Sequence, residues 1–93
     1  MANSDQLLYR DLKIVNELGL HARSAAKLAK TAQQAVDGVW LQTSQDEVDA
    51  KQIIDILTLG AGQGDRVRVR IDDPADQQIL DRIVELFNTG FGE

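Results

Sequence analysis

The length and composition of the chain fit one small folded domain, residues 1–93, and exclude a multidomain or a disordered chain, since 43% of the residues are hydrophobic and 27% are charged. Fifteen acidic and ten basic residues give a net charge of −5, which argues against broad binding to nucleic acid or to anionic membranes. The chain has no cysteine, and this excludes disulfides, thiolate metal sites and cysteine nucleophiles.

The amino-terminal sequence shows no targeting signal. Residues 1–8 lack a basic start and a sustained apolar stretch, and nowhere does an apolar run reach the length of about 18 residues that a membrane-spanning helix needs. We therefore expect a cytoplasmic protein without a signal peptide or a membrane span.

Hydrophobic periodicity predicts the elements of the first half of the chain. Residues 7–15 alternate apolar and polar side chains, which is typical of a half-buried strand. In residues 22–34 alanines recur every three or four positions, which predicts a helix with a small-residue face that can lie close to a sheet. Residues 39–43 alternate again, and a weaker apolar point at Val48 completes a predicted hairpin.

The second half continues with a short helix over residues 53–57, which ends at Gly60. Residues 66–71 alternate Arg with Val or Ile and predict a strand. We favour a solvated sheet face for its three arginines over a phosphate-binding stripe. Residues 72–74 (Asp-Asp-Pro) supply a helix cap and first turn, and apolar spacing predicts a third helix that ends near Gly90 as its C-terminal cap.

The predicted order is strand, helix, strand, strand, helix, strand, helix. Each helix has one apolar stripe, and all three stripes need the same face of the sheet. The sequence therefore predicts an α+β fold with the helices on one side.

The one histidine, His21, stands directly before the first predicted helix. A helix N-terminus has free backbone N–H groups and the positive end of the helix dipole, so it can hold an anion. Arg23 adds a guanidinium suited to phosphate oxygens, and Gly19 permits a close approach of the backbone. Because an imidazole nitrogen can attack phosphorus, His21 is a candidate phosphoryl carrier. The alternative is an incidental polar residue near a helix cap.

The charge pattern around His21 supports an anion site. Residues 18–35 contain Arg23, Lys27 and Lys30 and no acidic residue, a local charge of +3 in a chain of net −5. A metal centre is not expected, because there is no second histidine, no cysteine and no calcium-loop pattern, and we expect no cofactor. The glycines of residues 60–64 follow a helix and precede a strand, which indicates a turn and not a nucleotide loop.

Residues 19–23 (Gly-Leu-His-Ala-Arg), followed by two alanines at 25 and 26, resemble the active-site segment of the HPr family, the histidine phosphocarriers of the bacterial phosphotransferase system. The resemblance extends to residues 50–52 (Ala-Lys-Gln) and 57–60 (Leu-Thr-Leu-Gly). It implies an open-faced β-sandwich, a four-stranded antiparallel sheet with three helices on one face (βαββαβα). Residues 16–19 and 83–91 look more like the NPr, nitrogen-related, branch of the family.

The resemblance implies a phosphoryl carrier that is not itself an enzyme. An enzyme I type protein, charged from phosphoenolpyruvate, would pass the phosphoryl group to His21, which would hand it to a IIA-type acceptor. Arg23 would stabilise the phosphate, and Ala22, Arg23 and Ser24 would bind it. We expect a monomer with no nucleic acid or membrane partner. A second hypothesis is a regulatory binding module that uses the same face without transferring a phosphoryl group.

The expected docking face surrounds His21 with exposed apolar side chains ringed by cations. Its apolar members are Leu20, Ile53, Ile54 and Leu57, and its cations are Arg23, Lys27 and Lys30. We also expect at least one of the two adjacent isoleucines to belong to the core.

Two positions depart from the family pattern. Ser24 stands where the family usually has proline, which restores a backbone N–H in the first turn and leaves two roles open, a donor to the phosphoryl group or a plain first-turn serine. Gln52 stands where many HPr proteins of low-GC Gram-positive bacteria carry a serine phosphorylated by a regulatory kinase. Without a hydroxyl there, that control is not expected.

Overall fold

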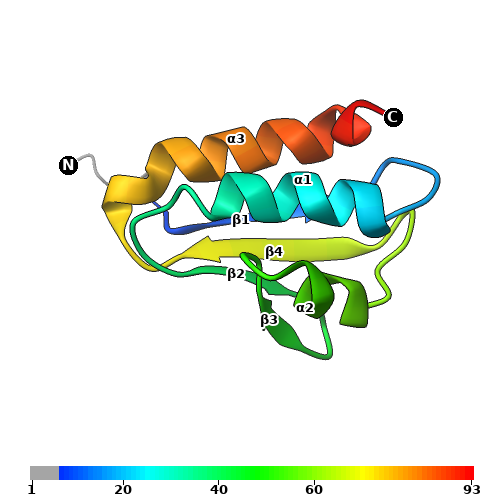
Figure 1. The fold of residues 1–93 in the computed structure, drawn as a ribbon, viewed down its shortest axis with the longest axis horizontal. Helices are drawn as coiled ribbons and strands as arrows, with labels where there is room; N and C mark the ends of the chain where they lie inside the picture. The colour runs from blue at the N-terminus through cyan, green and yellow to red at the C-terminus, as the bar shows by residue number, and fades with distance from the viewer. Residues whose placement is uncertain (1–6) are drawn as a thin grey trace.

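A four-stranded antiparallel sheet forms one layer of the protein in the computed structural model, which describes residues 7–93 (Figure 1). The strands are β1 (Tyr9–Lys13), β2 (Val39–Gln42), β3 (Glu47–Asp49) and β4 (Arg66–Ile71). They lie in the order β1-β4-β2-β3, so β4 is central and pairs with both β1 and β2. In the register of the sheet, Val69 of β4 lies opposite Arg10 of β1 on one side and opposite Leu41 of β2 on the other.

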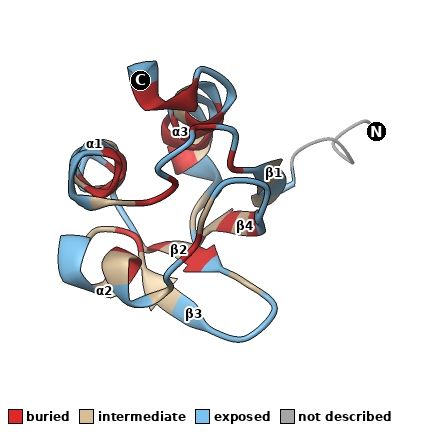
Figure 2. Cartoon of the chain, turned by 90° about the vertical axis from the view of Figure 1, so that its right-hand side faces the viewer, coloured by how far each residue is buried: buried red, intermediate tan, exposed pale blue. Residues whose placement is uncertain are grey.

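The helices cover one face of this sheet and leave the other open (Figures 1 and 2). They are α1 (Ala22–Ala32), α2 (Ile53–Thr58) and α3 (Gln77–Asn88), with short 3-10 turns at Pro74–Asp76 and Gly90–Gly92. Helix α1 packs between α2 and α3. The predicted α+β class, the βαββαβα order and the open-faced sandwich are confirmed.

The core lies between the sheet and the helices, where the buried colour of Figure 2 is concentrated. Three of the alanines predicted to form the small-residue face of α1, Ala25, Ala29 and Ala32, are no more than 1% exposed. Their small side chains let the helix lie close to the sheet. Alternate residues of β4 complete this layer: Val67, Val69 and Ile71 are buried.

The third helix starts later than the sequence predicts. Residues 74–76 form a 3-10 turn capped by Asp73, whose carboxylate accepts from the Ala75 N–H at 2.8 Å. Asp76 is buried, and its carboxylate accepts from the backbone N–H groups of Val36 (2.9 Å) and Asp37 (3.1 Å). Because Asp76 ties this turn to the loop after α1, the α-helix begins at the next residue. Gly90 follows the helix with φ +62°, as predicted for a C-terminal cap.

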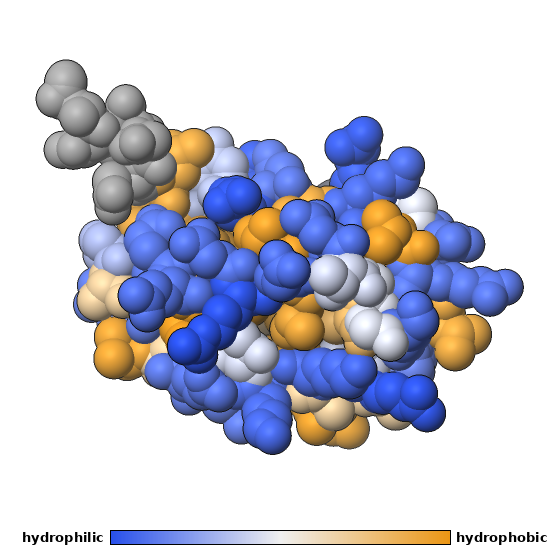
Figure 3. All heavy atoms as spheres, turned by 90° about the horizontal axis from the view of Figure 1, so that it is seen from above, coloured by the Kyte–Doolittle hydropathy of each residue, from blue (hydrophilic) through white to orange (hydrophobic). Residues whose placement is uncertain are grey.

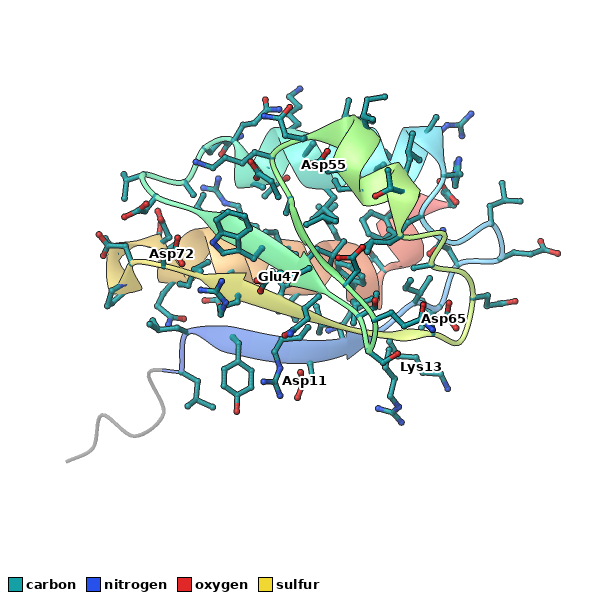
Figure 4. The ribbon with its side chains drawn as sticks, turned by 90° about the horizontal axis from the view of Figure 1, so that it is seen from below. Asp11, Lys13, Glu47, Asp55, Asp65 and Asp72 are labelled. Atoms are coloured by element: carbon teal, nitrogen blue, oxygen red, sulfur yellow. The ribbon has the colours of Figure 1, made fainter. Side chains whose placement is uncertain are left out.

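The open face of the sheet carries arginines paired with acids. Arg68 binds Asp11 through two hydrogen bonds, of 2.7 and 3.0 Å, and lies 4.0 Å from the centre of the Tyr9 ring. Arg70 binds Asp72 at 2.8 Å and Glu47 at 3.3 Å. Figure 4 labels these three acids, on β1, on β3 and directly after β4. The pairing favours the solvated sheet face that we expected over a phosphate-binding stripe.

Asp72 has a role in the sheet and does not cap the third helix. Besides Arg70, its carboxylate accepts from the Trp40 indole N–H at 3.0 Å, which joins the end of β4 to β2. The hydrogen bond from Trp40 is the largest influence that lowers the pKa of Asp72, and the one from Arg70 adds to it, against the opposing effect of burial. The helix cap predicted from two consecutive aspartates is therefore provided by Asp73 alone.

The outer surface is mostly polar on the side seen from above in Figure 1, where hydrophobic spheres form separate patches among hydrophilic ones (Figure 3). Within residues 7–93, no helix is long and apolar enough to cross a membrane. Residues 1–6 lie outside the described residues, and with them most of the segment, residues 1–8, in which no signal peptide is expected.

Candidate functional site

His21 is the N-cap of α1. Its backbone is extended (φ −105°, ψ −174°), and its carbonyl accepts the first helical hydrogen bond, from the Ala25 N–H at 2.8 Å. Its side chain turns back onto the helix, so that the Arg23 N–H donates to the imidazole Nδ1, with 3.4 Å between the two nitrogens. The imidazole therefore presents Nδ1 to the positive end of the helix dipole.

Gly19 makes the turn that leads into this cap. It has φ +65°, a left-handed conformation that side chains disfavour. A Cβ at this position would lie 2.6 Å from the Gly62 Cα and 2.7 Å from the Ala61 carbonyl oxygen. The close approach that we expected of Gly19 is thus made to the turn after α2. The Leu20 N–H donates to the same Ala61 oxygen at 3.0 Å, and this hydrogen bond stabilises the contact.

The Ser24 side chain completes the N-terminal cap of α1. It is fully buried, its hydroxyl donates to the Gly19 carbonyl at 2.8 Å, and it accepts from the His21 N–H at 3.0 Å. Together with the bond to Nδ1, this forms a reciprocal capping box. Of the two roles left open by the sequence, the hydroxyl therefore has the structural one, and Ser24 offers an anion only its backbone N–H.

The start of α1 presents a cradle for an anion. The amides of Ala22, Arg23 and Ser24 all precede the first helical hydrogen bond, so they point out of the helix end. The Arg23 side chain is exposed and forms no ion pair within residues 7–93. The predicted phosphate-binding groups are therefore together beside the imidazole of His21.

Glu93 is a site residue that the sequence analysis missed. Its Oε2 lies 2.6 Å from His21 Nε2, and its Oε1 accepts from the side-chain amide of Asn16 at 3.1 Å. Burial raises the pKa of the Glu93 carboxyl, but the hydrogen bonds from Asn16 and His21 and the electrostatic interactions with His21 and Arg23 outweigh it, so the net pKa is lowered. The glycines on both sides of Phe91 signal a chain reversal, but no sequence pattern shows where it ends.

The residues expected to form the docking face differ in exposure. Ile54 is 71% exposed and Ile53 is 39% exposed, so the expectation that at least one of them belongs to the core is wrong. The isoleucine of α2 that belongs to the core is Ile56, which is fully buried. This short helix of six residues buries its middle and leaves its first turn at the surface. Leu57 is half-buried. Leu20 was expected to be exposed and is 5% exposed, because the turn at Gly19 directs it into the core.

The two lysines of α1 also differ. Both are exposed, and Lys30 lies in the last turn. The Lys27 ammonium donates to the Phe91 carbonyl at 2.6 Å and so holds the carboxyl-terminal segment against α1. Within residues 7–93 there is no group of three or more His, Cys, Asp or Glu side chains that could hold a metal ion.

An N-cap histidine with one ring nitrogen at the amides of the helix start, and with an exposed arginine two residues on, has the features of a histidine-based phosphoryl carrier. The family model described as "PTS HPr component phosphorylation site" matches residues 8–89. The phosphocarrier protein HPr of Cupriavidus necator is 40% identical over 87 residues, which cover 94% of this chain and 98% of that protein. The phosphocarrier protein NPr of Escherichia coli is 34% identical, with coverage of 88% and 92%.

Solved structures give the same result. A crystal structure of HPr from Thermoanaerobacter tengcongensis matches with a TM-score of 0.86 and 32% identity, and covers 91% of this chain and 96% of that one. The chain belongs to the HPr family and is a phosphocarrier of the phosphotransferase system. Relatives of both names, HPr and NPr, match it, so the assignment to the NPr branch stays a prediction.

Proposed function

We propose that His21 Nδ1 accepts the phosphoryl group from an enzyme I type protein, charged from phosphoenolpyruvate, and passes it to a IIA-type acceptor. The observation that carries this proposal is the orientation of the ring, with Nδ1 toward the Arg23 N–H at the start of α1. The protein is then a substrate and donor of phosphotransferases and not an enzyme. The resemblance implies a monomer that works in the cytoplasm.

Phosphoryl transfer needs a nucleophile and hydrogen-bond donors that stabilise the negative charge on the phosphoryl oxygens. The lone pair of Nδ1 attacks phosphorus, and the bond from phosphorus to the donor breaks with its electron pair returning to the donor. The phosphoryl oxygens then accept from the first-turn amides of Ala22, Arg23 and Ser24. The guanidinium of Arg23 neutralises charge that builds up in transfer. The Arg23 N–H exchanges its hydrogen bond to Nδ1 for one to a phosphoryl oxygen, and the helix start itself needs no rearrangement.

The partners dock on the exposed apolar side chains of α2, ringed by the cations of α1. Ile53 and Ile54 project from the first turn of α2, which packs beside α1. Leu57 is half-buried and contributes its exposed atoms to this face. Arg23 and Lys30 of the neighbouring α1 are exposed and form no ion pair within residues 7–93. Leu20 takes a structural part because it is buried, whereas Lys27 is exposed and remains part of this rim while it binds the Phe91 carbonyl. Exposed apolar patches with a polar rim are typical of protein docking surfaces.

The α2 side of the docking face lacks the regulatory serine of some relatives. Gln52, the N-cap of α2, is exposed and makes no side-chain cap hydrogen bond. Because an amide cannot be phosphorylated by a serine kinase, regulation of that kind is absent from the proposed function.

The test is incubation with phosphoenolpyruvate and a cognate enzyme I. We expect an acid-labile, alkali-stable phosphate on the wild-type protein and none on His21→Ala. Since His21 is the only histidine, loss of this phosphate in His21→Ala separates phosphohistidine from a phosphoramidate on a lysine. The variant should stay folded, because the imidazole is at the rim, 29% exposed. Labelled His21→Ala would refute the assignment, and an unlabelled wild type would favour a binding module that transfers no phosphoryl group.

A further inference from the structure

The carboxyl-terminal segment returns to the start of α1 by a sharp reversal. Gly90, Phe91 and Gly92 all have positive φ, of 62°, 59° and 74°. For Phe91 this conformation is strained, and it persists because the ring is buried, 1% exposed, and packs edge-on against Phe87 with 5.0 Å between ring centres. The hydrogen bond from Lys27 to the Phe91 carbonyl fixes the segment to α1. The chain end and the first turn of α1 therefore lie at one end of the molecule (Figure 1).

This reversal places the Glu93 side chain against the imidazole of His21. The side chain is only 15% exposed, with Oε2 on His21 Nε2 and Oε1 on the amide of Asn16. The Asn16 amide also donates to the Gly19 carbonyl at 2.8 Å, and Asn16 is buried. The carboxylate is thus held from two sides, by the loop before α1 and by the ring.

The two ring nitrogens of His21 have different partners, which together select one tautomer. Nδ1 accepts from the Arg23 N–H, so it carries no proton, and the ring proton is on Nε2, where it is donated to Glu93. A carboxylate on one ring nitrogen is a known way to orient an imidazole so that the other nitrogen can react.

We propose that Glu93 is a positioning residue for phosphoryl transfer: it holds the proton on Nε2, so that Nδ1 stays unprotonated and its lone pair can exchange the weak hydrogen bond from the Arg23 N–H for a bond to phosphorus. This inference rests on the proposed function and adds a residue to it. It also gives the strained, buried Phe91 a role, since this anchor brings the Glu93 carboxylate to the ring.

The charge balance of the step gives the carboxylate a second effect. When Nδ1 forms its bond to phosphorus, the proton stays on Nε2 and the ring gains a positive charge. Glu93 faces that charge directly and neutralises it, without contacting the phosphoryl group on the opposite nitrogen. When the acceptor takes the phosphoryl group, the bonding pair returns to Nδ1 and the ring is neutral again. A glutamine would match the shape of Glu93 but would not supply the charge.

The test compares Glu93→Gln and Glu93→Ala with Glu85→Gln, a control at an exposed glutamate of α3. In the unphosphorylated wild type and the control, NMR should show the Nε2 proton of His21 shifted downfield and slow to exchange. In both Glu93 variants that signal should move upfield or vanish. With an enzyme I partner, kcat of phosphoryl acceptance should fall about tenfold or more in both Glu93 variants, the size typical for loss of such an orienting partner, with KM unchanged.

Each other outcome overturns the inference. An unchanged Nε2 signal would mean that the contact does not hold the proton. A raised KM with unchanged kcat would make Glu93 a docking residue, and faster transfer would make it a shield over His21. An unphosphorylated wild type would refute the proposed function, whereas the Nε2 signal of the free protein would still decide whether Glu93 holds the ring.

Discussion

Arg68 and Arg70 on the open sheet face and Arg23 at the helix start have the same side chain and opposite surroundings. Arg68 is held by two hydrogen bonds to Asp11 and by the Tyr9 ring, and Arg70 is held by Glu47 and Asp72. Arg23 is exposed and has no acidic partner within residues 7–93.

The comparison shows that the number of cations on a surface does not locate an anion site. On the sheet face, carboxylates and aromatic rings already occupy the donors of Arg68 and Arg70, whereas Arg66 is exposed, forms no ion pair within residues 7–93 and has no histidine beside it. At the start of α1, the Arg23 guanidinium and the amides of Ala22 and Ser24 remain available, and the Arg23 amide is bound only to His21 Nδ1. A site for phosphate is therefore marked by donors that the fold leaves unused, next to a nucleophile.

The largest expected contrast comes from the same substitution in both regions. Arg23→Lys keeps the charge and loses the planar fork, so it should slow phosphoryl transfer by about 10²-fold, as loss of one stabilising donor typically does. Arg68→Lys should leave the transfer rate unchanged, because its partners are Asp11 and Tyr9. Single-turnover kinetics with an enzyme I partner measure both.

Binding affinity separates transfer from docking in this experiment. If Arg23→Lys weakens partner binding in the same proportion as it slows transfer, the guanidinium contributes uniform binding and the contrast with the sheet face fails. Equal rates for the two variants would contradict the account of Arg23 as well.

A smaller effect is expected from Ser24→Ala. The hydroxyl links His21 and Gly19 inside the cap, so its loss should cost about 1 kcal/mol of unfolding free energy. For a chain of this size that corresponds to a melting temperature lower by about 4–8 °C. The transfer rate should change much less than in Arg23→Lys. A rate loss of about 10²-fold with unchanged stability would show instead that the hydroxyl acts on the phosphoryl group.

The smallest effect concerns acid stability and belongs to the sheet face. The Arg68 hydrogen bond is the largest influence that lowers the pKa of Asp11 from its ordinary 3.8, and burial opposes it. The ionised pair therefore contributes fully above about pH 3.8 and is lost as the pH falls through the lower folded pKa. Asp11→Asn should be less stable than wild type at pH 7, and the gap should close in acid. Urea unfolding between pH 7 and 2 tests this, and a gap that stays constant would contradict it.

Much of the fold follows from local patterns. Strand β4 matches its predicted range because each apolar residue alternates with an arginine, and α1 begins where His21 can cap it. The start of α3 was predicted too early, because the loop contacts of buried Asp76 have no signature in the sequence around it.

The contacts around His21 were predicted where they are local and missed where they are not. His21 and Arg23 lie within one helical turn, so their proximity follows from sequence. Glu93 contacts a ring 72 residues earlier in the chain, and only the packing of Phe91 decides that it does. The burial of Leu20 and the exposure of Ile53 likewise depend on how the turn at Gly19 and the short α2 meet the sheet.

The central claim is that His21 carries the phosphoryl group on Nδ1, against the free amides of α1. The direct measurement is the ³¹P–¹⁵N coupling in ¹⁵N-labelled protein phosphorylated by an enzyme I partner. We expect the coupling to Nδ1, with the proton remaining on Nε2 beside Glu93. Coupling to Nε2 would contradict the account, because the phosphoryl group would then replace the Glu93 contact and leave the amide cradle unused.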